Sequence, residues 1–333
     1  MKILVTGGLG YIGSHTAVEL LNEGYEIAIV DDLYNSKIEV KDKIEEITGK
    51  TFNYYNLDVC NKEDLRKVFE SEGIDAVIHF AGYKAVGESV RKPLMYYRNN
   101  LDSTLTVLEL MEEFKVNKFI FSSSATVYGD PEKLPISEEA KVGGTTNPYG
   151  ATKLMIEGIL KDVSIANPNM NIIVLRYFNP VGAHKSYLIG ENPNGIPNNL
   201  MPYIVKVATG ELPKLTIFGN DYETKDGTGE RDYIHVVDLA KGHVAALKNF
   251  DKIEGVDYFN LGTGKAYSVL EMVEGFEKAN GVKVNYEIGP RREGDIASCY
   301  ADPSKANRVL NWKAEKTLDD MERDAYNYAI QGK

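Results

Sequence analysis

The sequence predicts an α/β fold in which a doubly wound parallel sheet carries a smaller C-terminal α/β lobe. Short β-branched runs without polar alternation, typical of strands buried on both faces, alternate with helix-length segments up to about residue 178. Beyond that residue, stretches rich in Gly, Pro and Asn become frequent, as in loops. The 333 residues also exceed the roughly 250–300 at which a single core tends to split, so we expect two lobes.

Six apolar runs predict the strands of the sheet, and five longer segments between them predict the connecting helices. The predicted strands are Ile3–Val5, Ile27–Val30, Phe52–Tyr55, Ala76–Phe80, Phe119–Phe121 and Ile172–Leu175, of which Phe52–Tyr55 has the weakest pattern. The predicted helices are Ser14–Asn22, Lys37–Thr48, Lys62–Glu72, Leu94–Phe114 and Thr152–Ala166.

The second half of the chain has a mixed pattern. Gly190–Pro197 and Asp221–Arg231 are predicted to be loops. In contrast, Val236–Phe250 has a helical pattern and Tyr258–Leu261 the pattern of a short strand, so they resemble one more unit of the sheet. We therefore assign residues 1–178 to the sheet lobe, with 233–262 returning to it. Residues 179–232 and 263–333 are assigned to the second lobe.

Composition argues against several classes of protein. A net charge of −11 argues against general nucleic-acid binding, which needs a basic face. Cys60 and Cys299 lie far apart, without the spacing of a disulfide framework or a zinc site. No apolar run approaches the roughly 18 residues of a membrane span, and the first strand begins at Ile3, which leaves no room for a signal peptide. We expect a cytoplasmic protein without membrane association.

A glycine-rich turn after the first strand predicts a dinucleotide site. Gly7, Gly10 and Gly13 have the spacing G-x-x-G-x-x-G, and Gly8 completes the plain pattern G-x-G-x-x-G. Without side chains at these positions, the amides that open a helix can approach a pyrophosphate closely. The sheet lobe is therefore predicted to be Rossmann-like.

Residues after the next strands support that site. Asp31 and Asp32 follow the second strand about 20 residues beyond the glycines, where a carboxylate accepts hydrogen bonds from the adenosine ribose. A carboxylate there would repel a 2′-phosphate, which favours NAD over NADP. Alternatively, Asp31 could be an ordinary turn carboxylate, and the same holds for Asp58, which follows the third strand. Later strand ends offer residues suited to the adenine edge and to packing on the dinucleotide, namely Asp58, Val59, Phe80, Ala81 and Gly82.

Tyr149 and Lys153 stand at i and i+4 where a helical pattern opens, so they share one face. A free tyrosine with a pKa of about 10 is a poor base near neutral pH. The charges of lysine and of an oxidised nicotinamide would favour its phenolate. Ser124 follows the strand Phe119–Phe121, at the sheet edge where ligands bind, and can share the proton of a substrate hydroxyl. Taken singly, Tyr149 could be a packed tyrosine, Lys153 a solvated lysine and Ser124 a loop serine. Together, behind a dinucleotide turn, the three residues indicate hydride chemistry at an alcohol carbon.

In this order, the glycine turn, Asp31, Ser124 and the Tyr149/Lys153 pair resemble an extended short-chain dehydrogenase/reductase. More closely, the chain resembles the UDP-galactose (UDP-glucose) 4-epimerases. That likeness rests on stretches from both predicted lobes: Val77–Val90, Phe119–Asp130, Leu175–His184, Gly195–Ile204, Ile217–Val236 and Pro290–Asp295. It implies an isomerase of galactose metabolism that retains NAD, oxidises C4 of a UDP-hexose to a ketone and reduces it from the other face.

The resemblance also implies roles for individual residues. Further cofactor contacts would come from Tyr11, Ile12, Asn35, Ser36, Lys84, Asn99, Tyr177 and Phe178, beside Ser124, Tyr149 and Lys153. The UDP-sugar would contact Ser124, Ala125, Thr126, Tyr149, Asn179, Asn199, Leu200, Thr216, Ile217, Phe218, Arg231, Arg292 and Asp295. Lysine and arginine suit a diphosphate chemically. Without the resemblance, Lys84 could be solvated, Arg231 a surface ion-pair residue and Asn199 a turn residue.

Cys299 bears on which sugars fit. Some proteins that resemble this chain have tyrosine at that pocket position, and cysteine would widen the cavity. We therefore expect UDP-N-acetylglucosamine and its galacto epimer to be accepted beside the plain sugars. The alternative is a small buried cysteine without a role in selectivity.

Two other functions stay open at this point. A dehydratase of the same superfamily would need an acid and a base after the strand-end serine, where Ala125 and Thr126 stand. A non-catalytic regulator that binds NAD or a UDP-sugar would have no need of Tyr149, Lys153 and Ser124 together.

The five histidines show no ligand spacing, so no metal site is predicted. A stripe at helical spacing either covers the sheet or, as the resemblance implies, forms a homodimer with the helix after Tyr149. Its members are Leu94, Tyr97, Leu101, Leu105, Leu108 and Met111.

Overall fold

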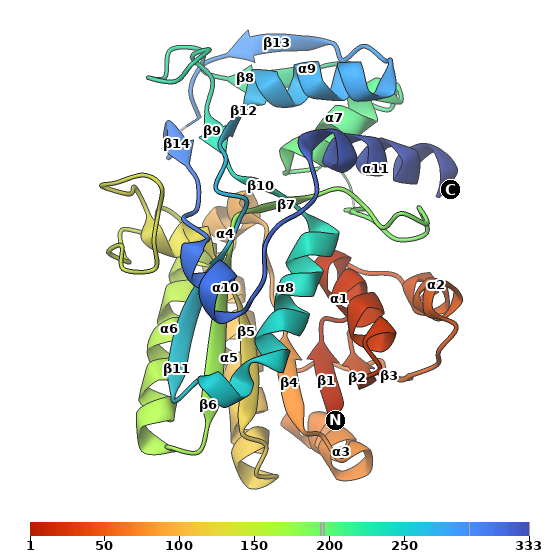
Figure 1. The fold of residues 1–333 in the computed structure, drawn as a ribbon, viewed down its shortest axis with the longest axis vertical. Helices are drawn as coiled ribbons and strands as arrows, with labels where there is room; N and C mark the ends of the chain where they lie inside the picture. Colours follow the sequence, from red (N-terminus) through yellow and green to blue (C-terminus); the bar gives the residue numbers. More distant parts are fainter. Residues whose placement is uncertain (194, 196, 293, 333) are drawn as a thin grey trace.

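A sheet lobe and a smaller lobe beyond one end of its strands make up the computed structural model, which describes residues 1–193, 195, 197–292 and 294–332 (Figure 1). Seven strands pair in parallel in the order β11-β6-β5-β4-β1-β2-β3, so the predicted doubly wound sheet is confirmed. The strands are β1 (Lys2–Thr6), β2 (Glu26–Val30), β3 (Asn53–Tyr55), β4 (Ala76–His79), β5 (Lys118–Ser124), β6 (Asn171–Tyr177) and β11 (Val256–Leu261).

The order of the strands locates a ligand crevice. Successive strands run outward in one direction from β1 to β3 and in the other from β4 to β6. The crevice at such a switch point, beyond the carboxyl ends of β1 and β4, is where open α/β sheets bind ligands. Tyr258–Leu261, which we expected to return to the sheet, lies in β11 and pairs with β6.

Helices cover both faces of the sheet, and each face has its own core (Figure 1). One core joins Val5 to residues of α1 (Tyr11–Asn22), α2 (Glu39–Thr48) and α8 (Val236–Lys248). The other joins Leu4 to residues of α3 (Lys62–Glu72), α5 (Pro93–Glu113) and α6 (Pro148–Ala166). Shorter elements are α4 (Val86–Arg91) and the 3-10 turns Ala125–Tyr128 and Phe250–Lys252. No helix of the described residues has both the length and the apolar character to cross a membrane.

The smaller lobe packs helices against short strands around a third core that contains Ile204, Ile217, Phe276 and Met321. Its helices are α7 (Leu200–Ala208), α9 (Val269–Asn280) and α11 (Leu318–Gln331), and α10 (Ser304–Val309) lies against the sheet lobe near β11. Its strand pairs are β8 (Leu215–Phe218) with β13 (Tyr286–Gly289), and β9 (Glu230–Arg231) between β12 (Tyr267–Ser268) and β14 (Ser298–Cys299). At the junction of the lobes, β7 (Asn179–Val181) pairs with β10 (Tyr233–His235). The predicted loop Asp221–Arg231 thus ends in a strand.

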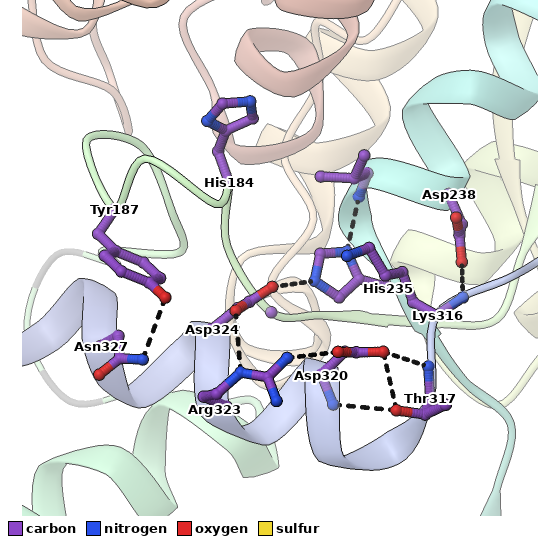
Figure 2. Close-up of polar contacts among 12 residues, drawn as sticks. His184, Tyr187, His235, Asp238, Lys316, Thr317, Asp320, Arg323, Asp324 and Asn327 are labelled. Carbon is purple, nitrogen blue, oxygen red and sulfur yellow. Dashed lines mark hydrogen bonds and ion pairs between the residues drawn. The ribbon is translucent and has the colours of Figure 1, made fainter.

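The C-terminal helix α11 is fastened to the junction by buried polar contacts (Figure 2). His235 accepts the Val237 N–H at Nδ1, 3.1 Å away, so its Nε2 is left to donate to Asp324 of α11 at 3.2 Å. Asp238 accepts the Lys316 N–H at 2.8 Å just before the helix begins. These contacts join α11 to the end of β10, and the segment just before α11 to the start of α8.

Candidate active site

The glycine turn has no space for side chains at its tightest points. Gly7 has a φ of +68°, and Gly10 is the N-cap of α1. A Cβ on Gly13 would lie 2.3 Å from the Gly7 carbonyl oxygen, and a Cβ on Gly7 would lie 2.8 Å from the Ala81 nitrogen. The open amides at the start of α1 therefore lie at the crevice between β1 and β4.

Asp31 holds this turn against the end of β2. Its carboxylate accepts the Leu9 N–H at 3.0 Å and the Ser36 hydroxyl at 2.6 Å. Burial raises the pKa of Asp31, while these hydrogen bonds act to lower it. Asp32 and Asn35 are exposed in the same loop.

The loop after β3 reaches the first half of α5. Asp58 accepts the Cys60 N–H at 2.8 Å, and the Cys60 thiol lies 3.6 Å from the Asn99 carbonyl oxygen. Val59 beside them is buried. The remaining predicted residues of this region, Phe80, Ala81 and Gly82, follow β4 at the switch point. The narrow glycine turn, the helix amides and Asp31 fit an NAD, whose pyrophosphate needs close backbone approach and whose ribose needs an acceptor.

Tyr149 and Lys153 lie in the first two turns of α6. The Asn147 side chain caps this helix by accepting a backbone N–H at 2.9 Å, and Pro148 occupies its first turn. This cap explains why the helix begins before Thr152, where the sequence pattern placed its start. The Lys153 Nζ lies 5.9 Å from the centre of the Tyr149 ring.

Lys153 is anchored to the strand that carries Ser124. Its Nζ donates to the Ser122 carbonyl oxygen at 2.7 Å. Ser124 ends β5 two residues later, and its hydroxyl accepts the Thr126 N–H at 3.2 Å across Ala125. All three predicted catalytic residues thus lie at one place on the carboxyl edge of the sheet.

Burial disfavours charge on both members of the Tyr149/Lys153 pair. It raises the pKa of Tyr149, against which a hydrogen bond with Ser124 acts, and lowers the pKa of Lys153 to about 8. The phenolate is an anion, so a further positive charge nearby would favour it over the neutral phenol. An oxidised nicotinamide carries that charge.

Tyr177 takes part in a buried chain of hydrogen bonds. Its hydroxyl lies 2.6 Å from the Ser122 Oγ and donates to the His243 Nε2, because the Nδ1 of that ring donates to the Leu239 carbonyl oxygen at 2.9 Å. Burial lowers the pKa of His243 to about 4, so that ring is neutral. The sequence patterns did not indicate Ser122 or His243, because α8 is distant in the chain and a single histidine in a helix carries no spacing signal.

A ring, a cation and a carboxylate meet at one exposed edge of the smaller lobe. Arg292 pairs with Asp295 through Nε at 3.1 Å and Nη2 at 2.8 Å. Its guanidinium lies 5.7 Å from the centre of the Phe218 ring. The preceding strand residues differ, since Ile217 is buried in the core and the Thr216 hydroxyl lies 3.3 Å from Glu287. Such an edge offers a face for stacking and a charge for phosphate.

Arg231 and Cys299 face each other across β9 and β14. The Arg231 Nη1 donates to the Ile296 carbonyl oxygen at 3.0 Å, so this residue is held by backbone rather than by a surface carboxylate. Cys299 packs against the apolar cluster that contains Phe178, and burial raises the pKa of its thiol to about 11. Asn179 follows Phe178 in the chain and is exposed at the start of β7.

Glu191 contacts two residues, Lys84 and Asn199, for which the resemblance implies different ligands, NAD and the UDP-sugar. Its Oε1 accepts the Asn199 side-chain N–H at 2.7 Å and lies 3.6 Å from the Lys84 Nζ. Lys84 also lies 5.8 Å from the centre of the Tyr11 ring at the start of α1, and Asn199 precedes Leu200, the first residue of α7. Glu191 lies in a predicted loop without a motif, so only the structure identifies it. Within that loop, positions 194 and 196 lie outside the described residues, as does position 293 of the stretch Pro290–Asp295.

A dinucleotide turn with a tyrosine–lysine–serine centre on one doubly wound sheet is typical of the extended short-chain dehydrogenases/reductases. Residues 3–262 match the model of the NAD dependent epimerase/dehydratase family, and the chain belongs to that family. In sequence it is similar to the UDP-glucose 4-epimerase of Bacillus subtilis, with 58% identity over 98% of this chain and 96% of that protein.

Two solved structures show the same likeness along the chain. One is the UDP-glucose 4-epimerase of Bifidobacterium longum in complex with NAD+ and UDP, with a TM-score of 0.96, 56% identity, and 99% of this chain and 98% of that chain covered. The other is the UDP-Glc/GlcNAc 4-epimerase of Campylobacter jejuni, with a TM-score of 0.87, 38% identity and 99% of each chain covered.

Proposed function

We propose that this protein interconverts UDP-glucose and UDP-galactose by epimerisation at C4, with NAD as a retained cofactor. The observation that carries the proposal is the Tyr149/Lys153/Ser124 centre beside the glycine turn, in a chain that matches UDP-glucose 4-epimerases over nearly its full length. The proposal also accounts for both lobes, one with the dinucleotide turn and one with the exposed Arg292 and Phe218.

Each residue of the centre has a distinct task. NAD, when bound, supplies the hydride acceptor and donor. Tyr149 takes the proton from the C4 hydroxyl and returns it to the other epimer, and Ser124 shares that proton. Lys153, fixed at the Ser122 carbonyl, stabilises the phenolate by its charge. Because the ketone must present its opposite face, the sugar must be held loosely while UDP is held firmly by Asn179, Asn199, Arg231, Arg292 and their neighbours.

Dehydration is a weaker candidate. It requires an acid and a base to eliminate water, and the residues after Ser124 are Ala125 and Thr126. A binding protein without catalysis would have no need of a lysine buried beside Tyr149, since burial disfavours the charged form.

The deciding experiment is to incubate purified protein with UDP-galactose and no added NAD, and to separate the UDP-hexoses by chromatography. We expect UDP-glucose to form until equilibrium, because the cofactor is regenerated in each cycle. Absence of UDP-glucose even after NAD is supplied would refute the proposal.

A wider choice of sugar is a second proposal, supported by Cys299. This short side chain packs against the cluster that contains Phe178, where a tyrosine ring would take up more space. UDP-N-acetylglucosamine and UDP-N-acetylgalactosamine are therefore further expected substrates.

We also propose how the protein assembles, where it is located and where its lobes divide. α5 and α6 pack together and expose large apolar side chains, of which Leu94 is 82% and Met155 48% exposed. A homodimer through these helices would cover them. Of the predicted stripe, Leu108 and Met111 are instead buried. We place the protein in the cytoplasm. We keep the lobe boundaries at residues 178, 232 and 262, with α10 packed on the sheet lobe.

A further inference from the structure

A buried ion pair lies one helical turn beyond Lys153. Glu157 of α6 and Arg176 of β6 have side chains only 5% and 4% exposed. Two contacts join them: the Arg176 Nη2 lies 2.6 Å from the Glu157 Oε2, and the Arg176 Nε lies 3.0 Å from the Oε1. Such two-point pairing is the strongest geometry for these groups.

Glu157 is also connected to the strand end that holds the reacting centre. Its Oε1 accepts the Ser123 hydroxyl at 2.6 Å. Ser123 stands between Ser122, whose carbonyl oxygen accepts Lys153, and Ser124. A single carboxylate therefore contacts the middle of the segment that anchors Lys153 and carries Ser124.

Arg176 is itself held on several sides. Its guanidinium lies 4.9 Å from the Tyr128 ring centre and 4.6 Å from that of Tyr258. Its Nη1 donates to the Tyr128 hydroxyl at 2.9 Å, and that hydroxyl donates to the Asn260 Oδ1 at 2.7 Å. The cation is thus fixed beside the Glu157 carboxylate, so the two buried groups are paired.

Stability alone does not explain this arrangement, because apolar residues of similar volume are often as stabilising as a buried ion pair. We propose that Glu157 is a positioning residue for the reaction: its charge keeps Lys153 in the ammonium form, and its bond to Ser123 aligns the end of β5. This inference rests on the proposed function, because it assigns a task within the same centre.

The electrostatic surroundings of Lys153 support this task. From its own helix, Tyr149 and Glu157 act on it, while β5 contributes the Ser122 carbonyl and β4 contributes His79. Burial lowers the pKa of Lys153 to about 8, and Glu157 acts in the opposite direction. Burial also lowers the pKa of His79 to about 3, so this ring is neutral and does not compete.

The groups around Glu157 complete the set. They are Arg176 of β6, Ser123 of β5 and Tyr258 of β11. The positive charge of Arg176 weakens the electrostatic effect of the Glu157 carboxylate. The effect that is left raises the pKa of Lys153.

The test is Glu157→Gln, which keeps an oxygen for Ser123 and removes the charge. The titration of Lys153 is followed by NMR in protein labelled at the lysine Cε carbons, with the Lys153 signal assigned from its loss in Lys153→Met. We expect the midpoint to fall by about one pH unit, and the alkaline limb of kcat to move down by the same amount. The double variant Glu157→Gln/Arg176→Met removes both charges, so it leaves no unpaired guanidinium and serves if the single variant fails to fold. It should move the midpoint of the Lys153 titration in the same direction.

Asp162→Asn is the matched control, because Asp162 is exposed on the same helix and the change in net charge is equal. An unchanged Lys153 midpoint in the folded Glu157 variants, or an equal shift in Asp162→Asn, would overturn the inference. Because the titration is read without turnover, it stays decisive even if the wild-type protein produces no UDP-glucose, a result that would refute the proposed function instead.

Discussion

The Lys153 ammonium nitrogen lies 5.9 Å from the centre of the Tyr149 ring and is held there by a hydrogen bond of 2.7 Å to the Ser122 backbone oxygen. If this lysine were free to move, water would solvate its charge and screen it from the phenol. This one has a fixed position, so the phenol beside it experiences a constant field. The first two predictions follow from that relationship.

Tyr149→Phe should fold normally and retain NAD, because the hydroxyl is the only group lost and the glycine turn is untouched. We expect kcat to fall by about 10²–10⁴-fold, the usual effect of removing a general acid–base group. Turnover of UDP-galactose and the absorbance of retained dinucleotide measure the two effects. A variant with near-normal turnover would contradict the role of Tyr149.

The wild-type pH profile should have an alkaline limb set by Lys153. Its ammonium form predominates below the pKa of about 8 and is lost as the pH rises through that value. We therefore expect kcat to decline above about pH 8, and Lys153→Met to show low activity without this limb. A wild-type profile that stays level to pH 10 would count against the assignment.

Gly13→Ala should abolish cofactor retention. The added methyl would lie 2.3 Å from the Gly7 carbonyl oxygen, so the turn must open, at a cost of about 3 kcal/mol in the free energy of unfolding. Gly158→Ala is the control, because that glycine lies within α6 and, beyond its chain neighbours and its own helix backbone, no atom of the described residues lies within 4 Å of the added carbon. It should keep the cofactor and gain about 1 kcal/mol from helix propensity. Thermal unfolding and dinucleotide absorbance separate the two variants.

Glu322→Gln should stabilise the protein at alkaline pH. Burial in α11 raises the pKa of Glu322 to about 8, and neither carboxylate oxygen has a hydrogen-bond partner among the described residues. The folded state thus binds this proton more tightly than the unfolded chain, so stability is lost as the pH rises from about 4.5 to about 8.

We expect the Glu322 variant to gain on the order of 2 kcal/mol in the free energy of unfolding at pH 8 and little at pH 5. Denaturant unfolding at the two pH values measures this difference. Glu274→Gln on the exposed side of α9 should show no such pH-dependent gain. Equal gains at both pH values would mean that Glu322 is not protonated in the fold.

Cys299→Tyr should change the choice of sugar more than the rate of the reaction. A tyrosine ring at this position, near the cluster that contains Phe178, should narrow the sugar site and exclude the N-acetyl group. We expect the ratio of acetylated to plain sugar turnover to fall at least about tenfold, equivalent to about 1.4 kcal/mol. Parallel assays of the four UDP-sugars measure it, and an unchanged ratio would dismiss Cys299 as a selectivity residue.

Much of the sheet lobe could be predicted because its signals are local. Buried strands such as Ile27–Val30 stand out as unbroken apolar runs, and the sheet predicted from them is confirmed. The family, which was predicted from the motifs and the resemblance, is confirmed as well. Ser124 and the Tyr149/Lys153 pair came from short motifs, and the structure brings these three residues together. Helix starts were less accurate, because the caps at Gly10 and Asn147 lie outside the apolar pattern.

The smaller lobe could not be predicted in the same detail. Its strands β9, β12 and β14 are two residues long, too short for an alternating pattern. Glu191, Ser122 and His243 owe their positions to contacts between segments distant in the chain, which one sequence does not display. Whether the predicted ligand residues bind as assigned stays a prediction.

The place of β11 at the edge of the sheet has a consequence for synthesis of the protein. During translation, β6 is complete long before Val256–Leu261 leaves the ribosome, and until then its outer edge has unpaired amides and carbonyls. Such an edge is a template for association with other chains. A fragment that ends near residue 178 should therefore aggregate more readily than the full chain, because the outer edge of β6 stays unpaired in it.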